Sequence, residues 1–402
     1  MIKQLLQTAM IAACLSTVGV VMAAETGPIK IAHVYGKTGI LAAYGRQLQR
    51  GLELGFDYAT GGTNKVLGRK IDILKMDDQM NAGRARALVA QAYSDDDATL
   101  VVGPIVSGFD LAVLPLAKQY KKIIMPEGVA DSITGSHWNR YVVRLERNSS
   151  QDAYAIALAI GGKGVCAATV AQDYAFGHDG ASTFKTALSN LGGRVVNEQF
   201  LPFNTTDFTA GGEKAINALK NTKGCKNKYI FIVWAGTANP FGGIEMLNPE
   251  RFGIHVTTGG NTLAALTLYK SAVGMKGGAY YYYKMPHNRV NNWLVKKHFE
   301  MYKSPPDFFT CVGFTEAQAI VAAIKKAGST NTNALIKAFE GLKLETPKGP
   351  MYIRPQDHQA MQNMYAFTVA LDSKEIWSGG VTLKLDRVIK ASEMDIPIYN
   401  KK

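Results

Sequence analysis

Two repeating patterns of apolar and polar positions alternate along most of the chain. Short apolar runs rich in β-branched residues, such as IKIAHVY at 29–35, are typical of buried strands. Longer segments with apolar residues three to four positions apart, such as AYGRQLQRGLELGFDYA at 43–59, predict amphipathic helices. Because the two kinds of segment alternate, we expect parallel sheets that are covered by helices.

The alternation runs through twice, with a restart near residues 140–151. The first unit has expected strands at 29–35, 70–78, 99–104 and 121–127, and expected helices at 43–59, 83–95 and 109–120. The second has expected strands at 164–173, 193–202, 228–236 and 254–260, and expected helices at 184–192, 208–221 and 241–248. A strand at 277–286, helices around 291–302 and 314–328, and a β-rich tail follow. In such α/β units ligands bind beyond the carboxyl ends of the strands.

The first 23 residues follow a different pattern. Lys3 precedes an apolar stretch that ends in Val21-Met22-Ala23, which is typical of a secretory signal peptide cleaved after Ala23. A membrane anchor is the alternative, but the run is short. A lipoprotein signal at Cys14 is another, but too few apolar residues precede that cysteine. No other window approaches about 20 uninterrupted apolar residues, so we expect a soluble protein exported to the periplasm.

Three cysteines remain after this segment. Cys166 begins one expected strand and Cys225 lies just before another, so the two share a sheet edge if those strands are parallel neighbours. Export permits disulfides, and we predict a bond between Cys166 and Cys225, with three unpaired thiols as the alternative. The sequence has no CxxC motif or Cys/His cluster, so we expect neither a metal nor a cofactor.

The chain is basic, with 45 Lys and Arg against 32 Asp and Glu and a formal net charge of +13. The basic residues are scattered and never occur three in a row, which argues against a nucleic-acid surface. A field that attracts small anions would explain this charge, and a generally basic surface would explain it equally well.

The stretch VVGPIVSGFD at 101–110 combines a buried strand, a tight turn and the start of a helix. Backbone N–H groups at a helix N-terminus favour negative charge. Neither a GxGxxG motif after the first strand nor a P-loop is present, which disfavours a nucleotide. His178, Asp179 and Ser182 lack a GxSxG elbow, which disfavours catalysis. The acidic group of another small molecule, or no ligand at all, therefore remains for this turn.

The ordered set of segments resembles the type I periplasmic solute-binding proteins of ABC importers, in the branched-chain amino acid receptor branch. The resemblance rests on IAHVYGKTGILAAYGRQLQRG, VVGPIVSG, AFGHDGASTFKTALSNLGGRVV and SPPDFFTCVGFTEAQAIVAAIKKAG, among others. It implies two lobes, each a parallel sheet flanked by helices, joined by three hinge crossovers near 144–150, 277–283 and 346–351. The implied first lobe is 24–146 with 284–346, and the second is 147–283 with 347–402.

The resemblance also implies a binding protein rather than an enzyme. Solute would bind in the cleft, the lobes would close on it, and an ABC permease in the inner membrane would recognise the closed state. A receptor that signals to another partner would use the same cleft. An exported α/β hydrolase would need a nucleophile, base and oxyanion site, which we do not find. We expect a monomer.

The family pattern places a set of residues around the cleft. In the first lobe these are Tyr44, Ser107, Gly128, Val129 and Ala130, and in the second Phe176, Trp234, Gly236 and Asn261, with Phe314 as a further aromatic. Backbone N–H groups near Ser107 and Val129 would hold a carboxylate, and Phe176 and Trp234 would supply flat apolar walls.

Two departures from the family pattern bear on the ligand. Amino acid binders usually have a hydroxyl residue at the position of Val129 and an acidic residue near 260–261, where this chain reads TTGGNTLAAL. A buried ammonium without a counter-charge costs several kcal/mol. We therefore expect an aromatic or related acid, which Arg147 could pair. Arg147 could equally well be a surface residue or form an interlobe salt bridge. Glu127 could supply the missing acidic partner, which leaves amino acids open.

Overall fold

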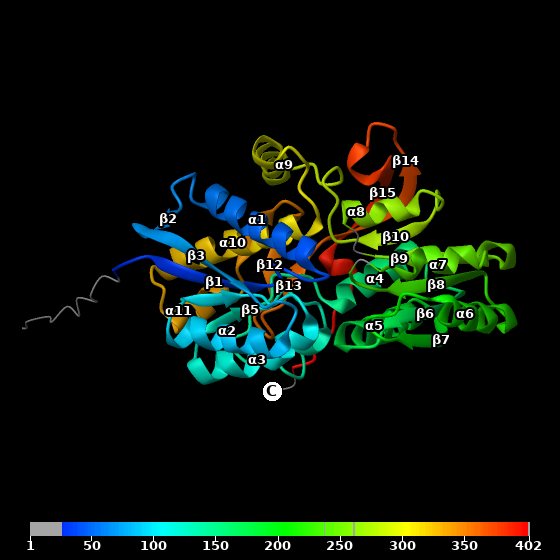
Figure 1. Ribbon diagram of the computed structural model, residues 1–402, viewed down its shortest axis with the longest axis horizontal. Coiled ribbons are helices and arrows are strands. Elements are labelled where there is room, and N and C mark those ends of the chain that lie inside the picture. Colours follow the sequence, from blue (N-terminus) through cyan, green and yellow to red (C-terminus); the bar gives the residue numbers. More distant parts are fainter. Residues whose placement is uncertain (1–25, 237, 260–261, 401–402) are drawn as a thin grey trace, which may run out of the picture.

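The computed structural model describes residues 26–236, 238–259 and 262–400 of the chain. Two α/β lobes lie side by side, one at the left of Figure 1 and the other at the right. The predicted signal peptide and Asn261 lie outside the described residues.

The first lobe is built on a five-stranded sheet in the order β2–β3–β1–β4–β5, with β2 antiparallel to β3 and the other pairs parallel. Its strands are β1 (Ile29–Tyr35), β2 (Lys65–Val66), β3 (Arg69–Asp77), β4 (Leu100–Val102) and β5 (Ile123–Met125). Its helices are α1 (Ala42–Ala59), α2 (Ala82–Ser94), α3 (Ser107–Tyr120), α9 (Arg289–Tyr302), α10 (Phe308–Ala327) and α11 (Thr332–Phe339).

Alternating side chains of these strands enter two different cores. Ile29 and Ile31 of β1 pack with α1, α10 and α11, whereas Ala32 and Val34 pack with α2 and α3 on the other face. This alternation follows from the two-residue period of a strand. Since both faces are covered, the strands read as nearly continuous apolar runs, as parallel strands do.

The second lobe is built on the four-stranded parallel sheet β7–β6–β8–β9. Its strands are β6 (Val165–Gln172), β7 (Arg194–Leu201), β8 (Asn227–Val233) and β9 (Ile254–Thr258). Its helices are α4 (Ser149–Ala159), α5 (Ala175–Asn190), α6 (Thr209–Asn221), α7 (Pro240–Met246) and α8 (Leu263–Leu266). The helices α4 and α5 cover one face, and α6, α7 and α8 cover the other.

The last third of the chain adds two small antiparallel sheets. One has the order β10–β14–β15, formed by β10 (Lys276–Ala279), β14 (Met364–Leu371) and β15 (Val381–Ile389). The other has the order β11–β12–β13, formed by β11 (Lys343–Thr346), β12 (Gly349–Ile353) and β13 (Ala360–Gln362). Within the described chain, α10 alone is long and apolar enough to span a membrane, and it lies buried in the protein core.

The observed elements follow the sequence pattern with several differences. The helices α4 and α8 were not expected, and α10 begins at Phe308, before the expected residue 314. The strand expected at 277–286 ends at Ala279, and beyond it the hydroxyls of Tyr281 and Tyr282 bond to Asn291 and Glu375. The helix expected at 184–192 begins nine residues earlier, at Ala175. The helix α11 was not expected.

Segments distant in sequence meet between the two lobes. The Arg147 guanidinium lies 5.5 Å from the ring centroid of Tyr280, and Lys348 Nζ lies 3.3 Å from the same centroid. Gln359 accepts from Arg144 Nε at 2.6 Å and donates to the carbonyl of Glu146 at 2.8 Å. The three segments implied as crossovers are therefore tied together by buried polar contacts.

The lobe boundaries of 24–146 with 284–346, and 147–283 with 347–402, stay a prediction. Met351 and Ile353 of β12 and Ala360 of β13 pack in the core of the first lobe. We therefore propose that the third crossover follows Gln362, rather than lying at 346–351.

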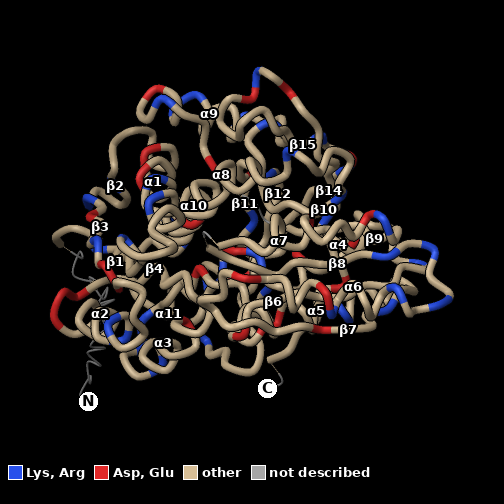
Figure 2. The backbone as a smooth tube through the Cα atoms, turned by 45° about the vertical axis from the view of Figure 1, so that its right-hand side comes forward, with Lys and Arg blue, Asp and Glu red and all other residues tan. Residues whose placement is uncertain are grey.

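Charged residues of both signs are spread over the two lobes. Figure 2 shows Lys and Arg positions interspersed with Asp and Glu positions along the chain. The formal charge of +13 is thus distributed rather than gathered into one continuous stripe in this view.

Cys166 and Cys225 form a disulfide bond, the pairing that the sequence predicted. Cys166 belongs to β6, and Cys225 directly precedes the neighbouring strand β8, so both lie at the amino-terminal edge of the sheet. Cys311 is a buried free thiol in α10.

Replacing Cys225→Ser should lower the melting temperature by about 5 °C or more in oxidising buffer. The bond closes a loop of 59 residues, and cross-links of this kind contribute about 2–4 kcal/mol. Scanning calorimetry with and without reductant measures the effect, and reduced wild type should melt with the variant. Cys311→Ala is the control, because its shift should not depend on reductant. A Cys225→Ser protein that melts with oxidised wild type would contradict a stabilising role.

Candidate functional site

A cavity lies between the two lobes, at the carboxyl ends of strands from both sheets. Its empty volume is about 840 Å³, the space at its open mouth included. The first-lobe wall comes from the segments that follow β4 and β5, and the second-lobe wall from those that follow β6, β8 and β9. This is the place that parallel α/β sheets favour for a ligand.

Ser107 is the first residue of α3 and forms part of the first-lobe wall. Its Oγ accepts hydrogen bonds from the backbone N–H groups of Val129 and Ala130, each at 3.2 Å. The N–H of Val129, which we expected to hold a carboxylate, is therefore already bonded. The Ser107 hydroxyl keeps its own hydrogen to donate into the cavity, at the positive end of the helix dipole.

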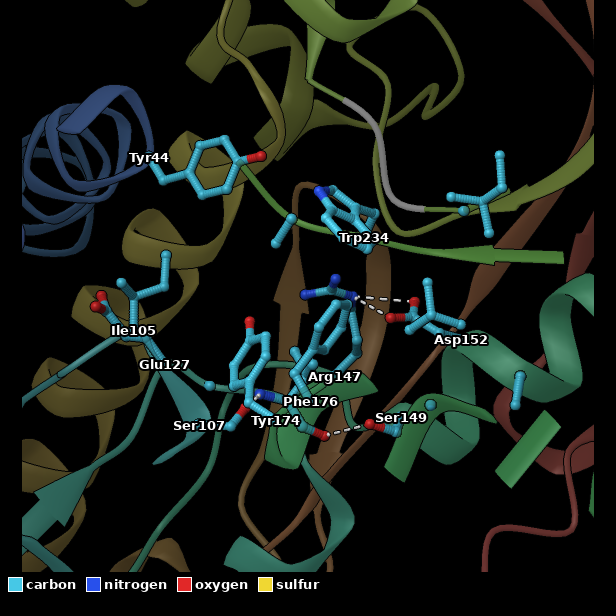
Figure 3. Close-up of a pocket in the computed structure, with 18 of the residues that line it drawn as sticks. Tyr44, Ile105, Ser107, Glu127, Arg147, Ser149, Asp152, Tyr174, Phe176 and Trp234 are labelled. Atoms are coloured by element: carbon cyan, nitrogen blue, oxygen red, sulfur yellow. Dashed lines mark hydrogen bonds and ion pairs between the residues drawn. The ribbon is translucent and has the colours of Figure 1, made fainter. Parts of the chain in front are cut away.

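Arg147 is the cation of the cavity. It directly precedes the capping box of α4, in which Asn148 bonds the backbone N–H of Gln151. Its Nε donates to both oxygens of Asp152 at 3.0 Å, and its Nη1 donates to Glu146. Among the described residues no hydrogen bond occupies Nη2. Figure 3 shows the guanidinium and its ion pair among the rings of Phe176 and Trp234.

The charge of Arg147 is fixed by its two partners. Burial alone favours the neutral guanidine, but the carboxylates of Asp152 and Glu146 raise the pKa of Arg147 above its ordinary value. The guanidinium lies 4.6 Å from the ring centroid of Phe308, which restricts its orientation further. Arg147 therefore forms the salt bridge that the sequence left open as the alternative, between Glu146 and Asp152 of the two expected lobes, and among the described residues its Nη2 edge stays unbonded.

Aromatic rings form much of the remaining wall. Tyr44 and Phe309 stack with centroids 4.3 Å apart on the first lobe, and Tyr174 and Phe176 lie 5.8 Å apart on the second. Trp234 follows β8 and meets Phe208 edge to face at 5.0 Å. Flat apolar walls with few polar groups suit a planar organic ligand.

Glu127 is the acidic group of the first-lobe wall. It is only 2 % exposed and lines the cavity just beyond β5. Neither carboxylate oxygen has a hydrogen-bond donor among the residues that the structure describes. His33 Nε2 lies 3.5 Å from Oε1. A ligand donor that reaches Glu127 would therefore satisfy a buried acceptor.

The structure brings most of the sequence-predicted site residues together. Those that line the cavity are Tyr44, Ser107, Gly128, Val129, Phe176, Trp234, Arg147 and Glu127. Ala130 is fully buried behind this wall. Gly236 lies at the edge of the cavity, where its N–H donates to the Tyr44 hydroxyl at 3.2 Å across the two lobes.

Phe314 does not line the cavity. Its ring packs against Tyr58 and Trp293 inside the first lobe. The aromatic of α10 that reaches the cavity is Phe309, five residues earlier in the first turn of the helix. Because a helix turns about 100° per residue, five positions place these two rings on different faces.

Sequence reasoning also missed Asp152, Tyr174 and Phe309. Tyr174 stands two residues before the predicted Phe176. Asp152 lies five residues after Arg147 in the first turn of α4, a helix that the sequence analysis did not predict.

Three contacts between the lobes flank the cavity. Besides Tyr44 with Gly236, the Ser132 hydroxyl donates to Asp179 at 3.1 Å, and the Leu263 N–H donates to Asp307 at 3.0 Å. Burial raises the pKa of Asp307 to about 6. These contacts hold the two lobes against one another around the ligand space.

Comparisons with known proteins agree on one family. The family model described as periplasmic binding protein matches residues 28–375. The Leu/Ile/Val-binding protein homolog 6 of Brucella abortus is 24% identical over 369 residues, which cover 87% of this chain and 89% of the relative.

Solved structures agree with this match. A crystal structure of an ABC-type branched-chain amino acid transporter from Rhodopseudomonas palustris is 48% identical, with a TM-score of 0.83, and the match covers 93% of this chain and all of that one. A solute-binding protein of an ABC transporter from R. palustris BisB5, in complex with 3,4-dihydroxybenzoic acid, shares the fold at 24% identity and a TM-score of 0.76, over 90% of this chain and 98% of that one.

Replacing Trp234→Ala should weaken ligand binding at least about 10-fold without unfolding the protein, because it removes a large ring from the cavity wall. Thermal shift with branched-chain amino acids, aromatic amino acids and benzoates, followed by calorimetry on the best binder, measures this. Trp377→Ala is the matched control, because that ring lies at the surface away from the cavity. Wild-type affinity in Trp234→Ala would remove this cavity as the binding site.

Proposed function

Because the chain belongs to the periplasmic binding protein family, whose members bind solutes rather than catalyse reactions, we propose that it captures a small aromatic carboxylic acid in the interlobe cavity. The family match and the 48% identical structure indicate that the chain is a solute-binding protein of an ABC transporter. The proposal concerns which solute it binds and how the cavity recognises it.

One observation carries the proposal: the unbonded Nη2 of a buried, preoriented arginine stands among aromatic rings. Arg147 cannot lose its charge, since two carboxylates hold it. A guanidinium edge of this kind prefers a carboxylate oxygen. The Ser107 hydroxyl supplies a second free donor on the opposite lobe, at the N-terminus of α3.

The walls of the cavity support an aromatic body for the ligand. Tyr44 and Phe309 on one lobe and Tyr174, Phe176 and Trp234 on the other offer flat faces from both sides. The structural relative from R. palustris BisB5 binds 3,4-dihydroxybenzoic acid. A benzoate-like acid is therefore the leading candidate for this chain as well.

A hydrophobic amino acid is the second candidate. Glu127 has two unbonded oxygens at the cavity, and a ligand ammonium would satisfy them. The relative that is 48% identical is named as a branched-chain amino acid transporter. On this alternative the ammonium pairs with Glu127 while the carboxylate goes to Ser107 or Arg147.

Ligand that bridges the two walls would stabilise the closed arrangement of the lobes. We propose that an ABC permease in the inner membrane reads this closed state, and that residues 1–23 direct the protein to the periplasm. A permease gene beside the gene of this protein would support transport, and a sensor kinase gene there would support signalling instead.

Titration calorimetry with benzoate, 4-hydroxybenzoate, leucine and phenylalanine tests the proposal. We expect the two benzoates to bind and the amino acids to bind at least about 10-fold more weakly, because an amino acid must give up the hydration of an ammonium group as well as that of its carboxylate. Tight binding of leucine with no binding of the benzoates would overturn the aromatic acid and favour the second candidate.

The Arg147→Lys variant, measured in the same titrations, tests whether Arg147 binds the ligand carboxylate. Lysine keeps a positive charge beside Glu146 and Asp152 but loses the unbonded guanidinium edge, so benzoate should bind about 10–100-fold more weakly. Arg354→Lys is the matched control, since Arg354 forms a buried pair with Asp357 away from the cavity. Unchanged benzoate affinity in Arg147→Lys would mean that the carboxylate binds elsewhere.

A further inference from the structure

A group of buried ionisable side chains lies behind the first-lobe wall of the cavity. All are at most 2 % exposed, and they are His33, Asp78, Asp110, Glu127 and Glu316. They come from β1, the end of β3, α3, the end of β5 and α10. The proposed function uses only Glu127 of this group, and only for its second candidate.

The contacts of His33 fix which of its nitrogens bears hydrogen. Gln49 Nε2 donates to Glu53, so the carbonyl oxygen of Gln49 faces His33 Nδ1 at 2.8 Å. An acceptor there requires Nδ1 to carry a hydrogen. The other nitrogen, Nε2, is then a bare lone pair in neutral histidine, and it faces Glu127 Oε1 at 3.5 Å. One shared proton between Nε2 and Oε1 turns this repulsive pair into an attractive one.

Glu316 meets Glu127 from the helix α10. Both carboxyl groups are buried, and none of their four oxygens has a hydrogen-bond donor among the described residues, so a proton on either group would relieve the repulsion between them. Burial, together with the charge of Glu127, raises the pKa of Glu316 well above its ordinary value. Glu127 therefore faces His33 at 3.5 Å and also acts electrostatically on Glu316.

The charges around the cavity favour the uptake of a proton when an anion binds there. Arg147 is the cation of the cavity wall, and it is already paired with the two acids Glu146 and Asp152. A bound carboxylate adds a further negative charge beside Glu127. A nearby negative charge favours the protonated form of an acid.

We propose that His33, Glu127 and Glu316 form a proton-sharing group that takes up a proton from solvent when an anionic ligand enters the cavity. The inference rests on the proposed function, because it assumes a carboxylate ligand without an ammonium. The proton comes from the bulk buffer and ends on one of the oxygens shared by Glu127 and Glu316, or on His33 Nε2. The bound carboxylate stays ionised on Arg147.

Other groups face Glu127 and set the balance of charge around it. Those packed against it or acting on the group are Tyr35 and His33 of β1, Asp78 after β3, Asp110 of α3, Glu316 of α10, and Glu146 and Arg144 of the first crossover. Burial, followed by the charge of Glu127, raises the pKa of Asp110. Most of these neighbours are acidic and favour proton uptake, whereas the positive charge of Arg144, which is hydrogen-bonded to the neutral Gln359 and Thr134, opposes it at Asp110.

Benzoate is the probe for the experiment, because it has one carboxylate and no other group that titrates near neutral pH. Calorimetric titrations of the wild-type protein in buffers with different ionisation enthalpies give the number of protons taken up per benzoate. We expect about 0.3 or more near pH 7, and an affinity that falls about 3-fold or more from pH 6 to pH 8.5, since uptake on binding must weaken binding as protons become scarce.

Two variants show which residues take up the proton. Glu316→Gln imitates a permanently protonated Glu316, so it should bind benzoate within about 3-fold of wild type at pH 6 while its proton uptake falls by at least half. Lys348→Met is the comparison, because burial lowers the pKa of Lys348 to about 7 and this lysine could also gain a proton. Proton uptake should persist in Lys348→Met.

The outcomes separate this inference from the proposed function. Benzoate binding without proton uptake in the wild type overturns the inference and leaves the function, and this result needs no variant to fold. Uptake that disappears in Lys348→Met but persists in Glu316→Gln also overturns it. Failure of benzoate to bind at any pH overturns the proposed function and this inference together.

Discussion

The ion pairs of Arg147 are the interaction on which the site depends. A single guanidinium joins Glu146 from the first crossover to Asp152 in the first turn of α4, and it packs over Phe308 of α10. Removing Arg147 would leave both acids without their partner, and breaking a buried ion pair in this way typically costs about 3–5 kcal/mol. The same pairing that ties the first crossover to α4 therefore also aims the unbonded edge of Arg147 at the ligand.

The two sheets supply the rest of the cavity by geometry alone. Parallel strands end at one edge of a sheet, and the segments after β4, β5, β8 and β9 bring their side chains to the gap between the lobes. The starts of two helices then position single groups. Ser107 is the first residue of α3, and Arg147 directly precedes Asn148, the N-cap of α4. The pocket is thus a consequence of two repeated α/β units facing one another.

The sequence predicted the parts of this molecule that depend on local pattern. The strand at 29–35, the helix at 43–59 and the Cys166–Cys225 bond appear as expected, because apolar periodicity and strand order determine them. Phe314 was misplaced and Phe309 missed, because side-chain direction along α10 depends on how that helix packs against α1. The meeting of Glu127 with His33 and Glu316 joins residues up to 283 positions apart and has no local signal.

A crystal structure of the protein grown with benzoate tests the central claim most directly. The account predicts a carboxylate oxygen within hydrogen-bonding distance of Arg147 Nη2, with the ring between the walls that hold Phe309 and Trp234. A benzoate bound outside this cavity, or one inside it whose carboxylate leaves Nη2 without a contact, would contradict the claim that Arg147 selects the ligand.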